Sequence, residues 1–340
     1  MDCSISAKIK LIMKIQQATD LSNKILQKAG FRTEESALIT QNLIAAELVE
    51  KKTHGLVRLP KIAELAKSGS IKVNNDDIEI ISEHPASIHF NGKSKPGFYA
   101  IYKSLEKAVD KVKQSGILAV GIKDLAYASG YIGNYARLAT EQNLIYIGFH
   151  NSPGGLVPFG STKDLWGTNP ITIGIPTHNI PVILDMASSQ CTWGDLMVAK
   201  TEGRTLKNAV AIDRDGNTTI DPVKAMEGGI LPIAGHKGSG LAFVVELLGG
   251  GLSNSRIGGS VKGGWGSFYI LIDPIMFRDL KDFKDEVQSA INELKSAPKA
   301  KGVNEIFFPG EQSHIKRQKN IENDEIKISD KLMSELERLL

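Results

Sequence analysis

The chain has 340 residues, which is enough for a large buried core and for more than one lobe. Its hydrophobic share of 41%, its charged share of 23% and its net charge of +3 are close to those of average soluble proteins, so they give no support for a nucleic-acid-binding protein. Cys3 and Cys191 lack the spacing of a metal site or a disulfide framework, and no apolar run is long enough for a membrane span or a secretion signal. We therefore expect a cytoplasmic protein without nucleic-acid, membrane or metal partners.

Helical periodicity dominates the first 75 residues and returns at the end of the chain. The spacing of apolar residues predicts helices over residues 8–29, from Thr33 towards residue 53, and over residues 59–67. A last helix is predicted over residues 329–340, where Ser329 and Asp330 are typical of a helix start. The two chain ends are therefore expected to be helical.

Short apolar runs typical of buried strands alternate with helical patterns in the middle of the chain. Strands are predicted over residues 78–81, 86–90, 117–122, 144–149, 171–175, 182–184 and 267–272. Helices are predicted over residues 99–115, 131–142, 192–201, 238–252 and 283–295. This order predicts an α+β fold.

Residues 249–266 are unusually rich in glycine and also contain Arg256, Lys262 and Trp265. Such a composition is typical of a flexible connector. It also suits a mobile flap over a binding site. The sequence leaves both interpretations open.

His54 and Arg58 lie four residues apart, where Gly55 and Pro60 break a helical pattern. An imidazole can take up or release a proton near neutral pH, and a guanidinium can bind a carboxylate through two hydrogen bonds. The pair suits an enzyme that binds a small carboxylate substrate and moves a proton beside it. A single histidine at a helix end can also be a capping or packing residue.

Neither the G-x-G-x-x-G nor the G-x-x-x-x-G-K-[ST] nucleotide signature is present. The glycine-rich stretch 235–240 precedes a predicted helix, so its backbone N–H groups can meet a phosphate, and Lys237 can add a charge. Residues 184–189 place an Asp and two hydroxyls beyond a short strand, which is a common ligand position. Ordinary turns explain both segments equally well.

In their order and spacing, these motifs resemble the type-2 malate/L-lactate dehydrogenase family over about residues 21–309. That family includes ureidoglycolate dehydrogenase, 2,3-diketogulonate reductase and piperideine-2-carboxylate reductase. The matching motifs are Thr53-His54-Gly55 with Arg58, Tyr135-Ala136-Arg137-Leu138-Ala139, Asn151-Ser152-Pro153, Pro158-Phe159-Gly160, Gly167-Thr168-Asn169-Pro170, Leu184-Asp185-Met186-Ala187, Gly194, Asp221-Pro222, His236-Lys237-Gly238 with Gly240-Leu241, Ile272-Asp273-Pro274 and Pro309-Gly310-Glu311.

The resemblance implies hydride transfer between NAD or NADP and a 2-oxo or 2-hydroxy acid, or reduction of a cyclic ketimine. It also implies a homodimer and a non-Rossmann, mixed-sheet cofactor domain, in agreement with the missing signatures. We expect a helical lobe of residues 1–75 joined by a C-terminal helix at 312–340. We expect a connecting and substrate region at 76–120 and 270–311, and a cofactor-binding domain at 121–269 with the flap 249–266.

The resemblance also assigns roles to single residues. His54 matches a proton donor, and Arg58 matches an arginine that contacts substrate. The matching cofactor-contacting residues are Thr168, Asn169, Ile183, Leu184, Asp185, Met186, Ala187, Ser188, Ser189, His236, Lys237, Gly238, Gly310, Glu311 and Gln312.

Two positions depart from the family pattern. A family acid/base histidine falls on Tyr127 or Ala128. Tyr127 could donate a proton with the help of a nearby cation, or it could only pack on the substrate. Asp195 stands where a basic residue is common, and an acid there could steady a cationic imine. These departures keep open a ketimine reductase and a catalytically impaired, cofactor-binding homologue.

Overall fold

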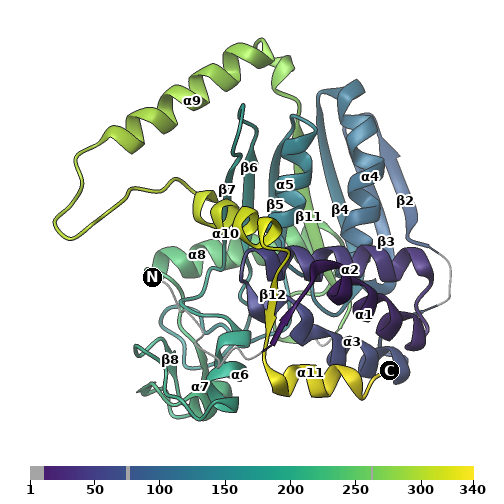
Figure 1. The fold of residues 1–340 in the computed structure, drawn as a ribbon, viewed down its shortest axis with the longest axis vertical. Helices are drawn as coiled ribbons and strands as arrows, with labels where there is room; N and C mark the ends of the chain where they lie inside the picture. The colour runs from purple at the N-terminus through teal and green to yellow at the C-terminus, as the bar shows by residue number, and fades with distance from the viewer. Residues whose placement is uncertain (1–10, 74–76, 262) are drawn as a thin grey trace.

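A seven-stranded mixed sheet forms the centre of the computed structural model, which describes residues 11–73, 77–261 and 263–340 (Figure 1). Among the described strands of this sheet, β3 and β4 pair in parallel and all other neighbours are antiparallel. In spatial order the strands are β2 (Glu79–His84), β3 (Ser87–Pro96), β4 (Ile117–Ala126), β11 (Trp265–Ile272), β5 (Ile145–His150), β6 (Ile171–Ile175) and β7 (Val182–Met186). This arrangement confirms the predicted α+β, non-Rossmann fold.

Two helices cover one face of the sheet, α4 (Gly97–Ser115) and α5 (Gly133–Glu141) (Figure 1). Buried and half-buried residues alternate along β5, as expected for a strand with two unlike faces. Tyr269 of β11 and Tyr146 of β5 stack at 5.2 Å beneath these helices, and the Tyr269 hydroxyl lies 2.9 Å from the Ser104 hydroxyl of α4. The main core therefore lies between the sheet and this helix layer, and it continues among the helices within residues 15–67.

The two chain ends meet in one helical lobe, as predicted. It contains α1 (Ile15–Lys28), α2 (Thr33–Leu48), α3 (Leu59–Lys67), α10 (Glu311–Glu322) and α11 (Asp330–Glu337). The strands β1 (Leu11–Met13) and β12 (Ile326–Ile328) pair antiparallel and join the two ends. Two predictions are therefore wrong: Leu11–Met13 is a strand and not part of a helix, and β12 interrupts the C-terminal helix. The predicted helix start at residues 8–10 lies outside the described residues.

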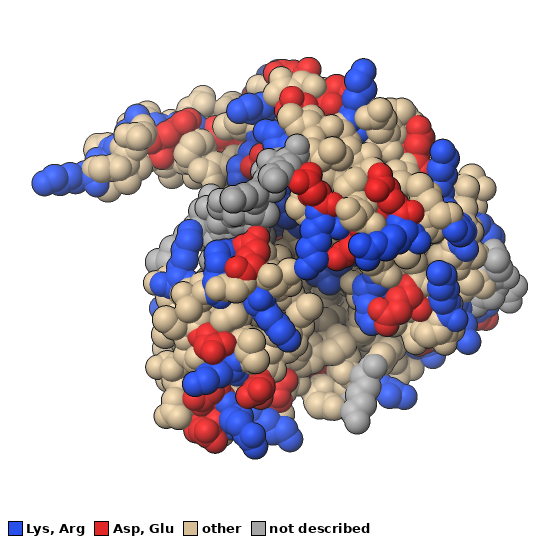
Figure 2. Space-filling model, turned by 60° about the horizontal axis from the view of Figure 1, so that its bottom comes forward, with Lys and Arg blue, Asp and Glu red and all other residues tan. Residues whose placement is uncertain are grey.

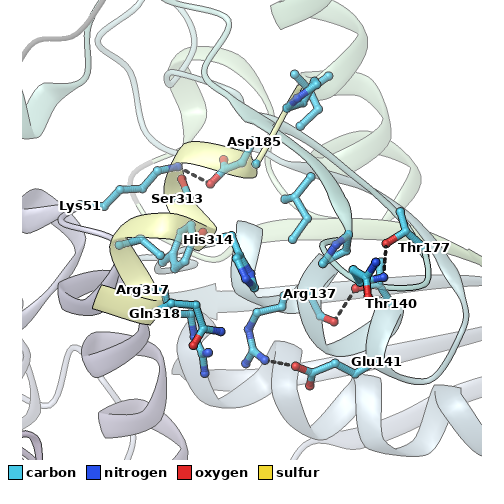
Figure 3. A pocket seen from close by; sticks show the side chains of 18 of the residues that line it. Lys51, Arg137, Thr140, Glu141, Thr177, Asp185, Ser313, His314, Arg317 and Gln318 are labelled. Carbon is cyan, nitrogen blue, oxygen red and sulfur yellow. Dashed lines mark hydrogen bonds and ion pairs between the residues drawn. The ribbon is translucent and has the colours of Figure 1, made fainter. Parts of the chain in front are cut away.

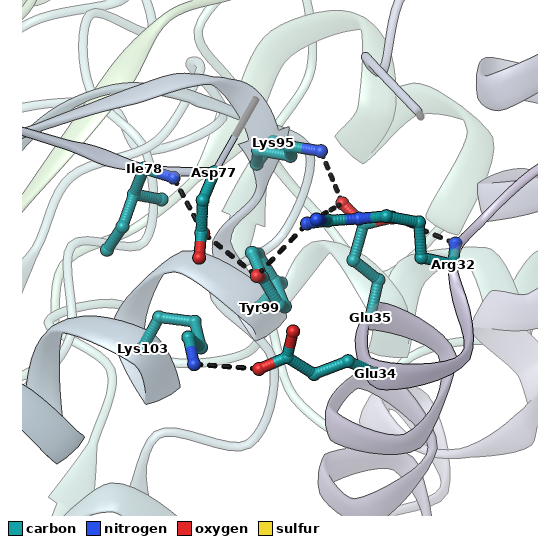
Figure 4. Close-up of polar contacts among 8 residues, drawn as sticks. All are labelled: Arg32, Glu34, Glu35, Asp77, Ile78, Lys95, Tyr99 and Lys103. Atoms are coloured by element: carbon teal, nitrogen blue, oxygen red, sulfur yellow. Dashed lines mark hydrogen bonds and ion pairs between the residues drawn. The ribbon is translucent and has the colours of Figure 1, made fainter. Parts of the chain in front are cut away.

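A polar network holds the helical lobe against the sheet (Figure 4). Lys95 of β3 and Glu35 of α2 form an ion pair whose side chains are both fully buried. Arg32 joins the network at 3.3 Å from Glu35 and from the Tyr99 hydroxyl, and that hydroxyl donates to Asp77 at 2.8 Å. Burial raises the pKa of Glu35, but the hydrogen bonds from Lys95 and Arg32 outweigh burial and hold this pKa below its usual value.

A small outer unit and one projecting helix complete the described chain. The outer unit contains α6 (Trp193–Thr201), β8 (Ala211–Ile212), β9 (Thr218–Thr219), α7 (Pro222–Gly228) and β10 (Gly229–Ile230), around a small core of its own. In Figure 1, α9 (Leu280–Ser296) and the segment after it extend away from the body of the molecule. None of the helices in the described parts of the chain is both long enough and apolar enough to cross a membrane.

The glycine-rich stretch 249–266 is packed at both ends. Helix α8 (His236–Val245) continues as a π-helix over Glu246–Leu252, and Trp265 begins β11. A Cβ on Gly249 would lie 2.9 Å from the Asn151 nitrogen, and a Cβ on Gly266 would lie 2.2 Å from the Gly249 oxygen. A side chain does not fit at these two glycines, because other backbone atoms lie too close. The prediction of a mobile flap is therefore wrong for the two ends of the stretch. Lys262 lies outside the described residues.

The expected domain boundaries also need correction. The boundary at residues 120 and 121 falls inside β4, and the boundary at residues 269 and 270 falls inside β11. Both strands are hydrogen-bonded members of one sheet, so the sheet is not divided there.

Figure 2 shows one face of the molecule, where Lys and Arg side chains are mixed with Asp and Glu side chains.

Candidate functional site

Two adjoining pockets lie where the helical lobe meets the sheet. We call the first the inner pocket; it has about 430 Å³ and is lined by His54, Arg58 and Tyr127, among others. We call the second the outer pocket; it has about 530 Å³, and Arg137 and Arg317 are among its lining residues (Figure 3). The residues that line both pockets are Lys51, Tyr131 and Asp185.

An ion pair marks the boundary between the pockets. Lys51 Nζ, just beyond α2, lies 2.5 Å from Asp185 Oδ2 at the end of β7 (Figure 3). The same ammonium lies 4.8 Å from the centroid of the Tyr131 ring. This contact joins the helical lobe to the edge of the sheet at the point where the pockets meet.

His54 is held in a short 3₁₀ turn, Lys52–His54, after α2. The buried Glu47 carboxylate fixes this turn, because it accepts hydrogen bonds from the Leu56 backbone N–H at 2.8 Å and from Lys52 at 2.5 Å. The Thr53 hydroxyl lies 2.9 Å from His54 Nδ1 and orients the ring. Burial, followed by the positive charges of Arg58 and Lys51, lowers the pKa of His54 to about 3, against a smaller opposing effect of Asp185. The imidazole is therefore neutral at physiological pH.

Arg58 lines the inner pocket, and only part of its guanidinium is used in hydrogen bonds to described residues. Its Nε donates to the Thr53 carbonyl oxygen at 2.6 Å, and its Nη1 donates to the Tyr127 hydroxyl at 3.2 Å. No carboxylate of the described residues lies within ion-pair distance of this guanidinium. Arg58 is thus available to bind the carboxylate of a ligand.

Tyr127 and Ala128, the two positions on which the family histidine falls, both line the inner pocket. The backbone of Tyr127 has a φ of 60°, which is uncommon for a residue with a side chain. The cation beside its hydroxyl is Arg58, with the guanidinium carbon 5.9 Å from the ring centroid. The structure therefore brings His54, Arg58 and Tyr127 together in one pocket.

Two further inner-pocket residues were missed by sequence reasoning, His150 and Trp265. His150 ends β5 and is 1% exposed; its Nδ1 lies 2.8 Å from the Ser267 hydroxyl. Burial lowers its pKa to about 4. Its Nε2 and the indole N–H of Trp265 are buried without a hydrogen-bond partner among the described residues. The available signal was a histidine at the end of a predicted strand, next to Asn151.

The predicted cofactor residues divide into two groups. Those that line the outer pocket are Ile183, Leu184, Asp185 and Gly310, and those that line the inner pocket are Thr168, Asp185 and Ala187. Those outside the lining of both pockets are Asn169, Met186, Ser188, Ser189, His236, Lys237, Gly238, Glu311 and Gln312. Lining a pocket does not by itself show cofactor binding, so cofactor binding stays a prediction for the residues of both groups.

Several residues of the second group have structural contacts. Asn169 is buried and donates to Glu246 at 2.6 Å, while Ser188 donates to the Asn169 carbonyl oxygen at 2.6 Å. Glu311 forms an ion pair with Lys295 at 2.6 Å. These contacts account for Ser188 and Glu311 without a ligand, whereas the Oδ1 of Asn169 is buried without a hydrogen-bond partner among the described residues.

Asp195 has a structural role at the start of α6. Its Oδ2 accepts hydrogen bonds from the backbone N–H and the hydroxyl of Thr192, both at 2.8 Å. This is a capping box that satisfies helix-start donors. Asp195 also lines the inner pocket, but capping accounts for its carboxylate, which weakens the case for a cationic imine held there.

The outer pocket has the chemistry that the phosphates of a dinucleotide require. Lys51, Arg137 and Arg317 line it, and the buried Arg317 Nε has no hydrogen-bond partner among the described residues. Gly310 precedes the first turn of α10 with a φ of 92°, and a Cβ there would lie 3.0 Å from Ile183. Lys51 and Arg137 are paired with carboxylates, so Arg317 is the described lining cation that remains for an anionic ligand. This cation and the helix start fit the nicotinamide cofactor that the resemblance implies.

Comparisons with known proteins agree with this fold. A sequence model described as malate/L-lactate dehydrogenase matches residues 13–337. The malate/(S)-sulfolactate dehydrogenase of Methanothermus fervidus is 32% identical over 97% of each chain. The solved sulfolactate dehydrogenase of Methanocaldococcus jannaschii is 30% identical, with a TM-score of 0.88 over 97% of this chain and 96% of that one. The solved malate dehydrogenase of Pyrococcus horikoshii is 27% identical, with a TM-score of 0.90 over 98% and 97%. This chain belongs to the malate/L-lactate dehydrogenase family.

Proposed function

We propose that this chain is an NAD- or NADP-dependent oxidoreductase that transfers a hydride between the cofactor and a small 2-oxo or 2-hydroxy acid. The observation that carries the proposal is the inner pocket, where a neutral His54 stands beside Arg58, a cation without a carboxylate partner among the described residues. The names of the relatives support the same substrate class, because they act on malate, sulfolactate and ureidoglycolate.

Arg58 binds the substrate carboxylate in this proposal. Its guanidinium offers two parallel N–H groups, which match the two oxygens of a carboxylate. Binding in this way fixes the neighbouring carbon relative to His54 and so reduces the entropy cost of reaction. Tyr127, which accepts a hydrogen bond from Arg58, packs against the same ligand.

His54 moves the proton. In the oxidation of a hydroxy acid, the neutral imidazole accepts the hydroxyl proton. In the reduction of an oxo acid, the bound carboxylate offsets the positive charge of Arg58, which raises the pKa of His54 and lets the ring carry the proton to the forming hydroxyl. The hydroxyl of Thr53 holds the ring in place through Nδ1.

Residues of both pockets would hold the cofactor. When bound, the nicotinamide supplies or accepts the hydride. Asp185 at the boundary and Ile183 and Gly310 in the outer pocket belong to segments that the resemblance assigns to the cofactor. The helical lobe thus provides the proton-transfer and carboxylate-binding groups, and the edge of the sheet provides the cofactor walls.

We further propose that the chain forms a homodimer in the cytoplasm. Phe243, Val244 and Leu247 of α8 and its π-helical extension are 48%, 46% and 41% exposed. Their spacing places them on one side of this helix, and an apolar surface of this kind is typical of a protein contact. Light scattering after gel filtration is expected to give twice the chain mass, and Phe243→Lys is expected to shift the mass to that of one chain.

The proposed function is tested by loss of NADH and NADPH absorbance with pyruvate, oxaloacetate, sulfopyruvate, pyrroline-2-carboxylate and piperideine-2-carboxylate. Turnover with at least one 2-oxo acid is expected. Turnover with the two cyclic imines alone would support the ketimine alternative instead. Cofactor binding without turnover on any compound would support the impaired homologue, against which the assembly of His54 and Arg58 in one pocket argues.

A further inference from the structure

The outer pocket contains more positive than negative charge. Its lining cations are Lys51, Arg137 and Arg317, and its lining carboxylates are Glu141 and Asp185. Asp185 pairs with Lys51, and Glu141 pairs with Arg137. Arg317 is the cation left over among the described lining residues.

Arg317 is poorly satisfied where it stands. Its Nε is buried and has no hydrogen-bond partner among the described residues, and no described carboxylate lies within ion-pair distance. Burial and, after it, the positive charge of Arg137 lower the pKa of Arg317, and Arg317 in turn contributes to the lowered pKa of His314. Figure 3 shows that His314 and Arg317 extend from α10 into the same space as Arg137 from α5. Because Arg137 is paired with Glu141, Arg317 is the guanidinium in this cavity that an anion would satisfy.

The position of Arg317 along α10 identifies the kind of anion. Gly310 stands at the helix start, beside Ile183. Asp185, two residues after Ile183, lies at the boundary with the inner pocket. Arg317 lies seven residues further, about 10 Å along the helix axis. The pyrophosphate of a dinucleotide joins its two nucleosides and therefore lies nearer the boundary. A phosphate at Arg317 is consequently one carried by the far nucleoside.

We propose that Arg317, with Arg137 beside it, binds a phosphate monoester on the adenosine ribose, so that the chain prefers NADP(H) to NAD(H). This inference rests on the proposed function only in treating the outer pocket as the adenosine end of the cofactor site. NAD would place a neutral hydroxyl at this position and would leave Arg317 without an anion. A 2′-phosphate supplies a dianion that accepts paired N–H groups from a guanidinium.

The test measures binding of 2′,5′-ADP and 5′-AMP by calorimetry, which is independent of turnover. The wild-type chain is expected to bind 2′,5′-ADP more tightly by at least about tenfold. Arg317→Gln is expected to weaken 2′,5′-ADP binding about ten- to a hundredfold and to leave 5′-AMP binding within about twofold. Arg317→Lys, which keeps the charge but loses the planar fork, is expected to lie between them.

Lys319→Gln is the matched control, because Lys319 is an exposed lysine of the same helix that does not line the pocket. It removes the same charge and is expected to change neither affinity. Unchanged thermal unfolding of Arg317→Gln would show that the variant is folded.

Equal affinity of the wild-type chain for 2′,5′-ADP and 5′-AMP would overturn the inference. Equal weakening of both ligands by Arg317→Gln would also overturn it, because Arg317 would then bind the 5′-phosphate shared by both. If NADH is oxidised by a 2-oxo acid but 2′,5′-ADP shows no preference, the inference fails and the proposed function stands. If 2′,5′-ADP is preferred but no 2-oxo acid is reduced, the proposed function fails and the inference stands.

Discussion

The inner and outer pockets both present an arginine without a carboxylate partner among the described residues, but the chain assembles them differently. In the inner pocket, Arg58 and His54 come from one short turn, and Thr53 in that turn contacts both side chains. In the outer pocket, Arg137 of α5 and Arg317 of α10 are brought together from opposite parts of the chain. We propose that the first pocket carries out proton transfer beside a bound carboxylate and that the second holds a phosphate.

The boundary between the pockets has a different character from either. Lys51 and Asp185 form an ion pair at 2.5 Å, so their opposite charges largely cancel and attract a ligand only weakly. Its effect is to fix the distance between the helical lobe and the edge of the sheet. The comparison therefore separates a chemical pocket, a binding pocket and a structural contact between them.

The largest expected effect comes from removing the proton-transfer group. His54→Ala is expected to lower kcat about 10²- to 10⁴-fold, because a positioned general acid or base contributes that much. NADPH and NADH binding should be unchanged, as measured by fluorescence titration. His84→Ala, at an exposed strand position, serves as the control. A near-normal kcat for His54→Ala would remove this residue from the mechanism.

Removing the carboxylate-binding group is expected to have the next largest effect. Arg58→Gln should lower kcat/KM for the 2-oxo acid about a hundredfold, mostly through KM, because a charge-assisted pair of hydrogen bonds is lost. Steady-state rates at saturating cofactor measure this change. An unchanged KM for the acid, with a raised KM for the cofactor, would show that Arg58 binds the cofactor and not the acid.

A smaller effect is expected at the boundary. Lys51 pairs with Asp185, and Asp185 lines both pockets. Lys51→Gln should therefore lower the affinity for the cofactor and kcat/KM for the acid by a similar factor of about ten. Calorimetry for the cofactor and steady-state rates for the acid provide the two values. A change in one value alone would show that the pair belongs to a single pocket.

The pH dependence is expected to show almost no effect. Because the pKa of His54 lies at about 3 in the free protein, the ring stays neutral between about pH 8 and about pH 5. The value of kcat/KM for oxidation of a hydroxy acid, which needs the neutral ring, should therefore not fall over this range on account of His54. A decrease centred near the ordinary histidine pKa would contradict the assigned environment of His54.

The inner pocket could be predicted because its main residues are close in sequence. His54 and Arg58 stand together in a segment whose Gly and Pro break a helix, and this pattern is visible without a fold. His150 was missed because its unpartnered nitrogen is a property of packing, which no local pattern shows. The convergence of Arg137 and Arg317 was also out of reach, since it depends on the long-range packing that brings α5 and α10 to one pocket.

The fold shows the same division between local and long-range information. Segments with a clear local apolar pattern, such as α3 and β6, were predicted with their observed bounds. The three-residue strands β1 and β12 were not, because their strand pairing is with each other, from opposite ends of the described chain. Leu11–Met13 has apolar residues that suit a helix equally well, and pairing with Ile326–Ile328 decides the outcome.

The separation of the two pockets is tested most directly by one two-substrate titration of the wild-type chain, Arg58→Gln and Arg317→Gln, with the 2-oxo acid and NADPH both varied. The account predicts that Arg58→Gln raises the KM of the acid and leaves that of NADPH unchanged. It predicts the reverse for Arg317→Gln. If either variant raises both KM values equally, or if the wild-type chain turns over no 2-oxo acid, the assignment of chemistry to one pocket and phosphate binding to the other is contradicted.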